Sequence, residues 1–217
     1  MIGFKGYERE EKVGRGSEKE VYEHPNDPAK VVAEFRYAES PKRLRGRFYL
    51  TKILHELFPD NLPDISVAAT NPHVVIMERK QLDEAHKSLQ KFNIKGDFVG
   101  NFSARYKEFE DKIGEDRKFK QLKRELAELG IGLETAAMNF GYDDKNNLVY
   151  VDSSFDPWPC YYHVDDKFER SYDPAKLRNA VNLLEPDRKK RALKYLERLE
   201  ILAEEEKAEL PQNQNNS

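Results

Sequence analysis

The segment GRGSEKEVY, at residues 14–22, constrains the fold and function of this chain more than any other feature. Gly14 and Gly16 permit a tight turn and a close approach of the backbone to a ligand, because glycine has no Cβ. The strand-like residues around them predict a β-hairpin whose turn, which includes Ser17, presents backbone amides to an anion. It is not a Walker-type loop, since no G-K-[ST] sequence opens a helix. The segment therefore predicts a hairpin that folds over a phosphate-bearing ligand.

A lysine occupies the position in this hairpin where a third glycine would be expected. Strand side chains alternate between two faces, so Lys19 and Val21 point the same way. If Val21 covers an adenine ring, Lys19 points toward the phosphates, where its charge offsets their mutual repulsion. The alternative is a plain β-hairpin with a solvated lysine, and the hairpin sequence alone favours neither interpretation.

A second block of polar residues lies far downstream, at Glu134, Asn139 and Asp152. Asn139 and Asp152 lie at the two ends of a predicted β-hairpin whose turn is at residues 143–147. This spacing suits a site for Mg²⁺ and phosphate groups, because Mg²⁺ prefers oxygen ligands. The alternative is a surface asparagine and a turn aspartate. Together with the glycine-rich hairpin, the block predicts a nucleotide-binding cleft between two lobes.

The first third of the chain predicts five strands around one helix, which begins at Ser40-Pro41 with a serine cap and a proline in the first turn. The predicted strands span residues 11–15, 18–23, 30–35, 65–69 and 73–77. From Lys80 to Leu133 the apolar spacing is mainly helical, and two later helices begin at Pro174 and Pro186. Glycines in the helical region predict loops near Gly96, Gly100 and Gly114, and a helix end at Gly130 and Gly132.

This order of elements, with its glycine-rich hairpin and its D/E-x4-N-x12-D block, resembles the protein-kinase-like superfamily over roughly residues 8 to 160. The resemblance implies an α+β protein with a bilobal kinase-like fold. A small antiparallel β lobe would be joined to a reduced, mainly helical lobe like those of bacterial kinase-like proteins. We expect the nucleotide-binding lobe at residues 1–79, the helical lobe with the catalytic-loop hairpin at residues 80–210, and a disordered tail at residues 211–217.

The third strand lacks the lysine that kinases usually take from it. Aligning the valines of KVVAEF puts Ala33 at that position, and Lys30 lies three residues earlier, facing away. The hairpin Gly-Arg-Gly-Ser-x-Lys-x-Val-Tyr is similar to that of the with-no-lysine kinases, which carry the lysine in the glycine-rich hairpin. The resemblance thus implies that Lys19 supplies the phosphate-binding charge. Glu56 is a candidate carboxylate partner by its position, with a solvated helix residue as the alternative.

The resemblance also implies ATP and Mg²⁺ as cofactors. Glu134 would be the general base, Lys19 and Asp152 would complete the catalytic set, and Asn139 with Asp152 would hold the metal. Met77 and Glu78, where the lobes would join, would contact the adenine edge. The full nucleotide-binding set is Gly14, Gly16, Ser17, Lys19, Val21, Val31, Met77 and Glu78.

Several departures from the kinase pattern leave the activity open. Gly132 and Leu133 stand where histidine and arginine precede the base, and Ser153-Ser154 follow Asp152. The leading interpretation is a phosphotransferase acting on a hydroxyl of an unidentified small-molecule or protein acceptor, with nucleotidyl transfer also open. A second is a pseudokinase that senses nucleotide or holds a partner, and a third is an α+β interaction protein with no nucleotide site.

Composition limits the remaining function classes. The net charge of −3 argues against a dedicated nucleic-acid partner, and the basic runs at residues 43–47 and 188–191 are expected to be solvated helix faces. No apolar run has the length needed to cross a bilayer, so no membrane partner is expected. Cys160 is the single cysteine, which excludes an intrachain disulfide and predicts a reducing, cytoplasmic location.

Overall fold

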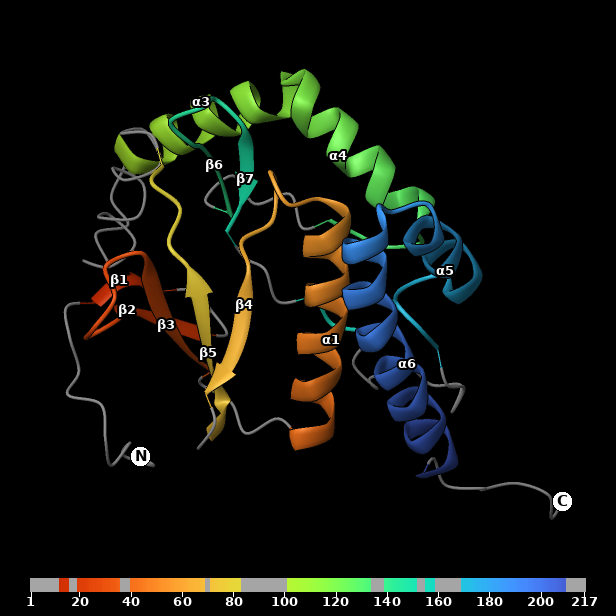
Figure 1. Ribbon diagram of the computed structural model, residues 1–217. Helices are drawn as coiled ribbons and strands as arrows, with labels where there is room; N and C mark the ends of the chain where they lie inside the picture. Colours follow the sequence, from red (N-terminus) through yellow and green to blue (C-terminus); the bar gives the residue numbers. More distant parts are fainter. Residues whose placement is uncertain are drawn as a thin grey trace, which may run out of the picture.

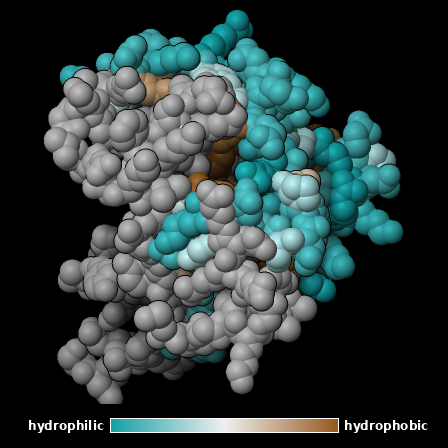
Figure 2. Space-filling view, turned by 90° about the vertical axis from the view of Figure 1, so that its left-hand side faces the viewer, coloured by the Kyte–Doolittle hydropathy of each residue, from teal (hydrophilic) through white to brown (hydrophobic). Residues whose placement is uncertain are grey.

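The computed structural model describes residues 12–15, 19–35, 40–68, 71–82, 101–133, 139–151, 155–158 and 169–209. These residues form an α+β protein with a five-stranded sheet, a separate two-stranded hairpin and five helices (Figure 1). The α+β class predicted from the sequence is confirmed. The described surface seen in Figure 2 is largely hydrophilic, as expected for a chain in which 35% of the residues are charged.

The sheet is antiparallel throughout, with the strand order β1-β2-β3-β5-β4. Its strands are β1 (Lys12–Arg15), β2 (Lys19–Glu23), β3 (Lys30–Phe35), β4 (Ile65–Ala68) and β5 (Asn71–Glu78). All five strands were predicted from the sequence, with ends that differ by two residues at most. Residues with high β propensity and the turn residues that flank them are therefore sufficient to locate this sheet.

The register of the sheet assigns side chains to its two faces. Val21 pairs with Ala33, which in turn pairs with Val75, so these three residues share a face. The pair of Val31 with Met77 lies two residues further along the same strands, on the same face. Residues of this face form a small hydrophobic cluster with α1 (Pro41–Leu57), to which the helix contributes Phe48.

Helix α1 begins where the sequence predicts. The Ser40 hydroxyl accepts a hydrogen bond from the Arg43 amide at 3.1 Å, and Pro41 is the first helical residue. The helix ends at Leu57, two residues before Pro59. Its side chains Leu50, Ile53 and Leu54 are fully buried in the larger hydrophobic core.

The C-terminal helix α6 (Pro186–Glu209) runs antiparallel to α1, on the side away from the sheet (Figure 1). Ion pairs join both ends of the two helices. Lys42 contacts Glu209 at 2.5 Å, and Arg191 contacts Glu56 at 2.6 Å. Because apolar residues of both helices are buried in the same large core, α1 is enclosed between the sheet and α6.

The remaining elements complete that core. They are α3 (Asn101–Glu115), α4 (Arg117–Glu128), β6 (Phe140–Tyr142), β7 (Leu148–Tyr150) and α5 (Pro174–Asn182). The predicted hairpin is confirmed as β6 and β7. The helix predicted to begin at Pro174 is α5, and Asp173 caps it by accepting hydrogen bonds from the amides of Ala175 and Lys176. No helix among the described residues is both long enough and apolar enough to cross a membrane.

The break predicted near Gly114 is confirmed at Asp116, which separates α3 from α4, while Gly114 itself lies in the last turn of α3. A single glycine costs a helix only about 1 kcal/mol relative to alanine, and burial of Phe109 and Ile113 on the same helix outweighs that cost. The helix end predicted at Gly130 is confirmed. This residue has φ +78°, and a Cβ there would lie 2.8 Å from the Asp173 amide nitrogen. Gly96 and Gly100 lie outside the described residues, as does the predicted tail.

Candidate functional site

A small pocket with a cavity volume of about 20 Å³ lies between the sheet and α1. Most of its wall is apolar, and its polar side chains are two cations and a hydroxyl. The sheet contributes Lys19, Ala33, Phe35, Ile65, Val75 and Met77, and the helix contributes Leu44, Arg47, Phe48 and Thr51.

Lys19 enters this pocket from the glycine-rich hairpin. The residue is 8% exposed and pairs in register with Phe35 of β3, which also lines the pocket. The solvated lysine considered as an alternative is therefore wrong. A charged side chain on an otherwise largely apolar wall makes this wall a candidate binding surface for a ligand that carries an anionic group.

The third strand supplies no cation to the pocket. Ala33 of β3 lines the pocket and pairs in register with Val21 of β2. Phe35 of β3 pairs in register with Lys19. Lys30 faces away, as its odd spacing predicts. Its side chain is 50% exposed and forms an ion pair with Asp27 at 2.8 Å. Among the described residues of the first two sheet hairpins, Lys19 is thus the cation that lines the pocket.

Arg47 and Thr51 are pocket residues that the sequence analysis missed. The interpretation of the basic run as a solvated helix face is correct for the exposed Arg45 but wrong for Arg43 and Arg47. The Arg47 side chain is 7% exposed. The sequence spacing could have shown that Arg47 and Thr51 face inward. Residues three and four apart share one helix face, and this face carries Leu44, Arg47, Phe48 and Thr51.

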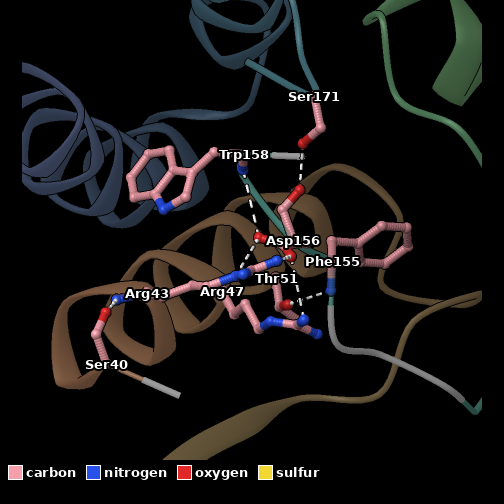
Figure 3. Close-up of polar contacts among 8 residues, drawn as sticks. All are labelled: Ser40, Arg43, Arg47, Thr51, Phe155, Asp156, Trp158 and Ser171. Carbon is pink, nitrogen blue, oxygen red and sulfur yellow. Dashed lines mark hydrogen bonds and ion pairs between the residues drawn. The ribbon is translucent and has the colours of Figure 1, made fainter. Parts of the chain in front are cut away.

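The Asp156 carboxylate accepts hydrogen bonds from both Arg43 and Arg47 (Figure 3). Its Oδ2 accepts hydrogen bonds at 3.1 Å from Arg43 Nε and at 3.1 Å from Arg47 Nη2. The Asp156 residue is itself fixed, because its Oδ1 accepts from the Trp158 amide at 3.3 Å and its backbone oxygen accepts from the Ser171 hydroxyl. One carboxylate thus links helix α1 to residues 155–158.

Close packing brings residues 155–158 against α1. Phe155 and Trp158 are buried, and the Phe155 amide donates to Thr51 Oγ1 at 3.4 Å. Gly46 makes this approach possible. A Cβ at Gly46 would lie only 2.9 Å from Pro157 Cγ and 2.9 Å from Trp158 Cζ2.

Glu56 does not contribute to the pocket. The residue is buried, and its two carboxylate oxygens accept hydrogen bonds from Arg191 at 2.6 and 2.9 Å. This ion pair raises the pKa of Arg191, with the hydrogen bond to Glu56 as its main cause. The solvated interpretation of Glu56 is therefore wrong. In the second basic run, Arg191 is 56% exposed, as expected, although Arg191 and Arg188, which lies 3.9 Å from Glu56, both pair with this carboxylate.

The other described residues of the predicted nucleotide-binding set belong to the same sheet but not all to this face. Met77 lines the pocket, and Val21 and Val31 belong to the adjoining hydrophobic cluster. Gly14 is buried in β1 opposite Val21. Glu78 ends β5, and its amide already donates to the Asp64 carbonyl at 2.8 Å.

The predicted metal site is described only at Asn139. This residue precedes β6, and its carbonyl oxygen accepts from the Val151 amide at 2.8 Å. The described residues contain no group of three or more histidine, cysteine, aspartate or glutamate side chains able to hold a metal. Gly16, Ser17, Glu134 and Asp152 lie outside the described residues.

The pocket has the chemistry of a site for a partly apolar anion. Apolar walls suit a planar ring or chain, and buried cations suit negatively charged oxygens, whose attraction is stronger where water is excluded. No protein-family model matches this chain. A search of curated proteins finds no similar sequence either.

Proposed function

We propose that the pocket between the sheet and α1 binds the nucleotide of a kinase-like ATP- and Mg²⁺-dependent phosphotransferase. The observation that carries this proposal is the burial of Lys19 in an otherwise largely apolar wall, on the same sheet face as Val21. That is the position which a phosphate-binding lysine of the glycine-rich hairpin would need. The acceptor would be a hydroxyl of a small molecule or protein.

The order of the elements supports the same proposal. A glycine-rich hairpin, a third strand, a helix and two further strands follow one another along the chain, as the resemblance to the kinase-like superfamily implies. A buried hairpin follows the helices, with Asn139 before its first strand. A bilobal arrangement and a cytoplasmic location remain parts of this proposal.

In this proposal, separate residues would bind the nucleotide and take part in phosphoryl transfer. Ala33, Val75 and Met77 would contact the base, and Lys19 would bind phosphate oxygens. Glu134 would take the proton from the acceptor hydroxyl as that oxygen bonds to the γ-phosphorus and the bond to the β-phosphate oxygen breaks. Magnesium, held by Asn139 and Asp152, would neutralise charge on the phosphates.

A pseudokinase is the second candidate, and two observations favour it. Glutamate stands where the base of the kinase pattern is an aspartate. Glu56 of α1 is engaged with α6, so the described residues of this helix present no carboxylate to the pocket. Such a protein would bind nucleotide without transferring a phosphoryl group.

Calorimetric titration with ATP, with and without magnesium, tests nucleotide binding. Lys19→Ala should abolish it, and Lys30→Ala is the matched control, since it removes the same charge from an exposed position of the same sheet. Equal affinity in both variants would exclude a phosphate-binding role for Lys19. Hydrolysis or transfer of labelled ATP that is lost in Asp152→Asn would identify an enzyme, and binding without turnover would identify a pseudokinase. If the wild type does not bind ATP and its thermal stability does not rise when ATP is added, the third interpretation, an α+β interaction protein, is the one that remains.

A further inference from the structure

We propose that the outward face of α4 binds the phosphate backbone of a double-stranded nucleic acid, through electrostatic contacts that do not depend on the base sequence. The face consists of the exposed side chains of Arg117, Lys120, Lys123 and Arg124, and is called the α4 basic face. None of these residues lines the pocket between the sheet and α1. Binding at this face is therefore independent of the proposed nucleotide site.

The charge density of α4 is the first observation. From Arg117 to Arg124, five of the eight residues are cations and none is acidic, in a chain whose net charge is −3. Residues three and four apart share one side of a helix, so Arg117, Lys120 and Arg124 form a row about 10 Å long along the axis. Glu125 and Glu128 follow at the C-terminal end of the helix, so the cations are concentrated in its first two turns.

Core packing fixes the direction of the α4 basic face. Phe119, Leu122 and Leu126 on the other side of the helix are buried in the larger hydrophobic core. The helix lies at the periphery of the molecule, and its cationic side chains are exposed (Figure 1). A large rigid partner can therefore reach several of them at once.

The described residues neutralise little of this charge. Lys120 pairs with Glu115 at 2.8 Å, but both side chains are exposed, and exposed pairs contribute little. Lys123 lies over the Phe119 ring, which carries no net charge. Arg117 and Arg124 form no hydrogen bond or ion pair with any described residue.

The other two basic runs of the chain differ in this respect. Arg47 of the first run pairs with Asp156, and Arg191 of the second pairs with Glu56. Both carboxylates lie more than 100 residues away in the sequence. The run in α4 is thus the one of the three for which the described structure provides no distant carboxylate.

The cations of α4 also act against the stability of the helix. The helix dipole favours negative charge at the N-terminus, yet Arg117 and Lys118 occupy the first turn, which has no acidic residue beyond the cap Asp116. Lys120 and Arg124 are four residues apart, where like charges repel. Proteins tolerate such local conflicts mainly at functional surfaces, so these conflicts favour an anionic partner over a merely solvated face.

The chemistry of the face favours a nucleic-acid duplex among anionic partners. A duplex carries one phosphate charge per about 1.7 Å of its axis, so it can contact the whole row. Helices that lie on membranes insert an apolar side, but that side of α4 is buried in the core. Protein interfaces and single-strand sites use exposed apolar or aromatic side chains, and the large exposed hydrophobic residues of the described structure, Leu183 and Ile201, lie outside α4.

Fluorescence anisotropy of a labelled duplex of about 20 base pairs, made as DNA and as RNA, tests this binding with the intact protein between 50 and 200 mM salt. The test variant is Arg117→Gln/Lys120→Gln/Arg124→Gln. Loss of three phosphate contacts should weaken binding at 50 mM salt by at least about 10-fold. It should also make the slope of log K against log salt shallower by about 2.7.

Two control variants separate the α4 basic face from net charge and from folding. Lys190→Gln/Lys194→Gln/Lys207→Gln removes the same charge from exposed positions of α6 and should bind within about twofold of the wild type. Arg117→Lys/Arg124→Lys keeps the charge and should retain most of the affinity, since phosphate contacts depend on charge. Glutamine, lysine and arginine have similar helix propensities, so circular dichroism should show all variants folded.

Each outcome decides for or against the α4 basic face. Failure of the wild type to bind either duplex at 50 mM salt overturns the proposal, as do equal losses in the α4 and α6 triple variants. Phosphatidylserine vesicles and polyglutamate are the competing probes. If either binds as tightly as the duplex and its binding is lost in the α4 variant, the partner is a membrane or an acidic protein and the nucleic-acid assignment fails. Lys19→Ala should keep duplex binding, so loss of the nucleotide function leaves this face intact.

Discussion

Replacing Gly46 by alanine should destabilise the protein, although alanine is the better helix residue. In a helix interior the change from glycine to alanine contributes about 1 kcal/mol in favour of folding. At Gly46, however, the new Cβ would lie 2.9 Å from Pro157 Cγ and from Trp158 Cζ2. The indole ring is 1% exposed and has no room to move aside, so the overpacking should cost about 1–3 kcal/mol. We expect a net loss of about 0–2 kcal/mol in the free energy of unfolding.

Gly114→Ala is the matched control for this measurement. Gly114 also lies in a helix, and no atom lies within 4 Å of the position that its Cβ would occupy. The variant should gain up to about 1 kcal/mol from helix propensity alone. Urea denaturation followed by circular dichroism gives both free energies of unfolding, provided that the slope with denaturant is unchanged.

The difference between the two alanine variants isolates the contact with residues 155–158. It should be about 1–3 kcal/mol, with Gly46→Ala the less stable. A Gly46→Ala variant as stable as Gly114→Ala would show that these residues do not pack on α1, and the anchoring of Arg47 by Asp156 would then lose its basis.

The remaining predictions concern the stability of the protein and its dependence on pH. Tyr172→Phe should raise the free energy of unfolding by about 1 kcal/mol at neutral pH, because the buried Tyr172 hydroxyl makes no hydrogen bond with any described residue. Burial raises the pKa of Tyr172 to about 12 from 10.0, so the folded form holds this proton more tightly. The wild type should then lose about 2–3 kcal/mol of stability as pH rises from about 10 to about 12, and a phenylalanine variant with the same alkaline profile would contradict this assignment. Asp116→Ala should cost about 1 kcal/mol, since the Asp116 carboxylate caps α4 through the amides of Lys118 and Phe119. Burial alone would raise the pKa of Asp116, but hydrogen bonds from the Tyr142 hydroxyl and the two amides outweigh it, and the net pKa is lowered from 3.8. The contribution of the Asp116 carboxylate to the free energy of unfolding should therefore be present above pH 3.8 and lost as pH falls below it. Asp116→Asn keeps an accepting oxygen and should retain stability without this acid dependence. Equal acid profiles in the wild type and Asp116→Asn would refute this prediction.

The sheet and the helix ends were predictable because their signals are local. Residues with high β propensity between turn formers located the strands. Ser40, Asp173 and Gly130 marked helix boundaries with side-chain or backbone chemistry that acts within a few residues. The place of Lys19 on the sheet face also followed from alternation alone. These features depend on neighbours in the sequence, which any single chain displays.

The buried charges could not be predicted in the same way. Arg47 is buried because Asp156, 109 residues away, accepts its hydrogen bond, and Glu56 is buried because Arg191, 135 residues away, donates to it. A charged residue on a helix is solvated by default, and only a distant partner changes that. The sequence alone therefore predicted one cation of the pocket and missed the second.

The position of α1 has a mechanical consequence. Helix α1 lies between the pocket and α6. Ion pairs join its two ends to α6, Lys42 with Glu209 at one end and Glu56 with Arg191 at the other. Because residues of α1 form one wall of the pocket, a displacement of α6 that these ion pairs transmit to α1 would also displace that wall.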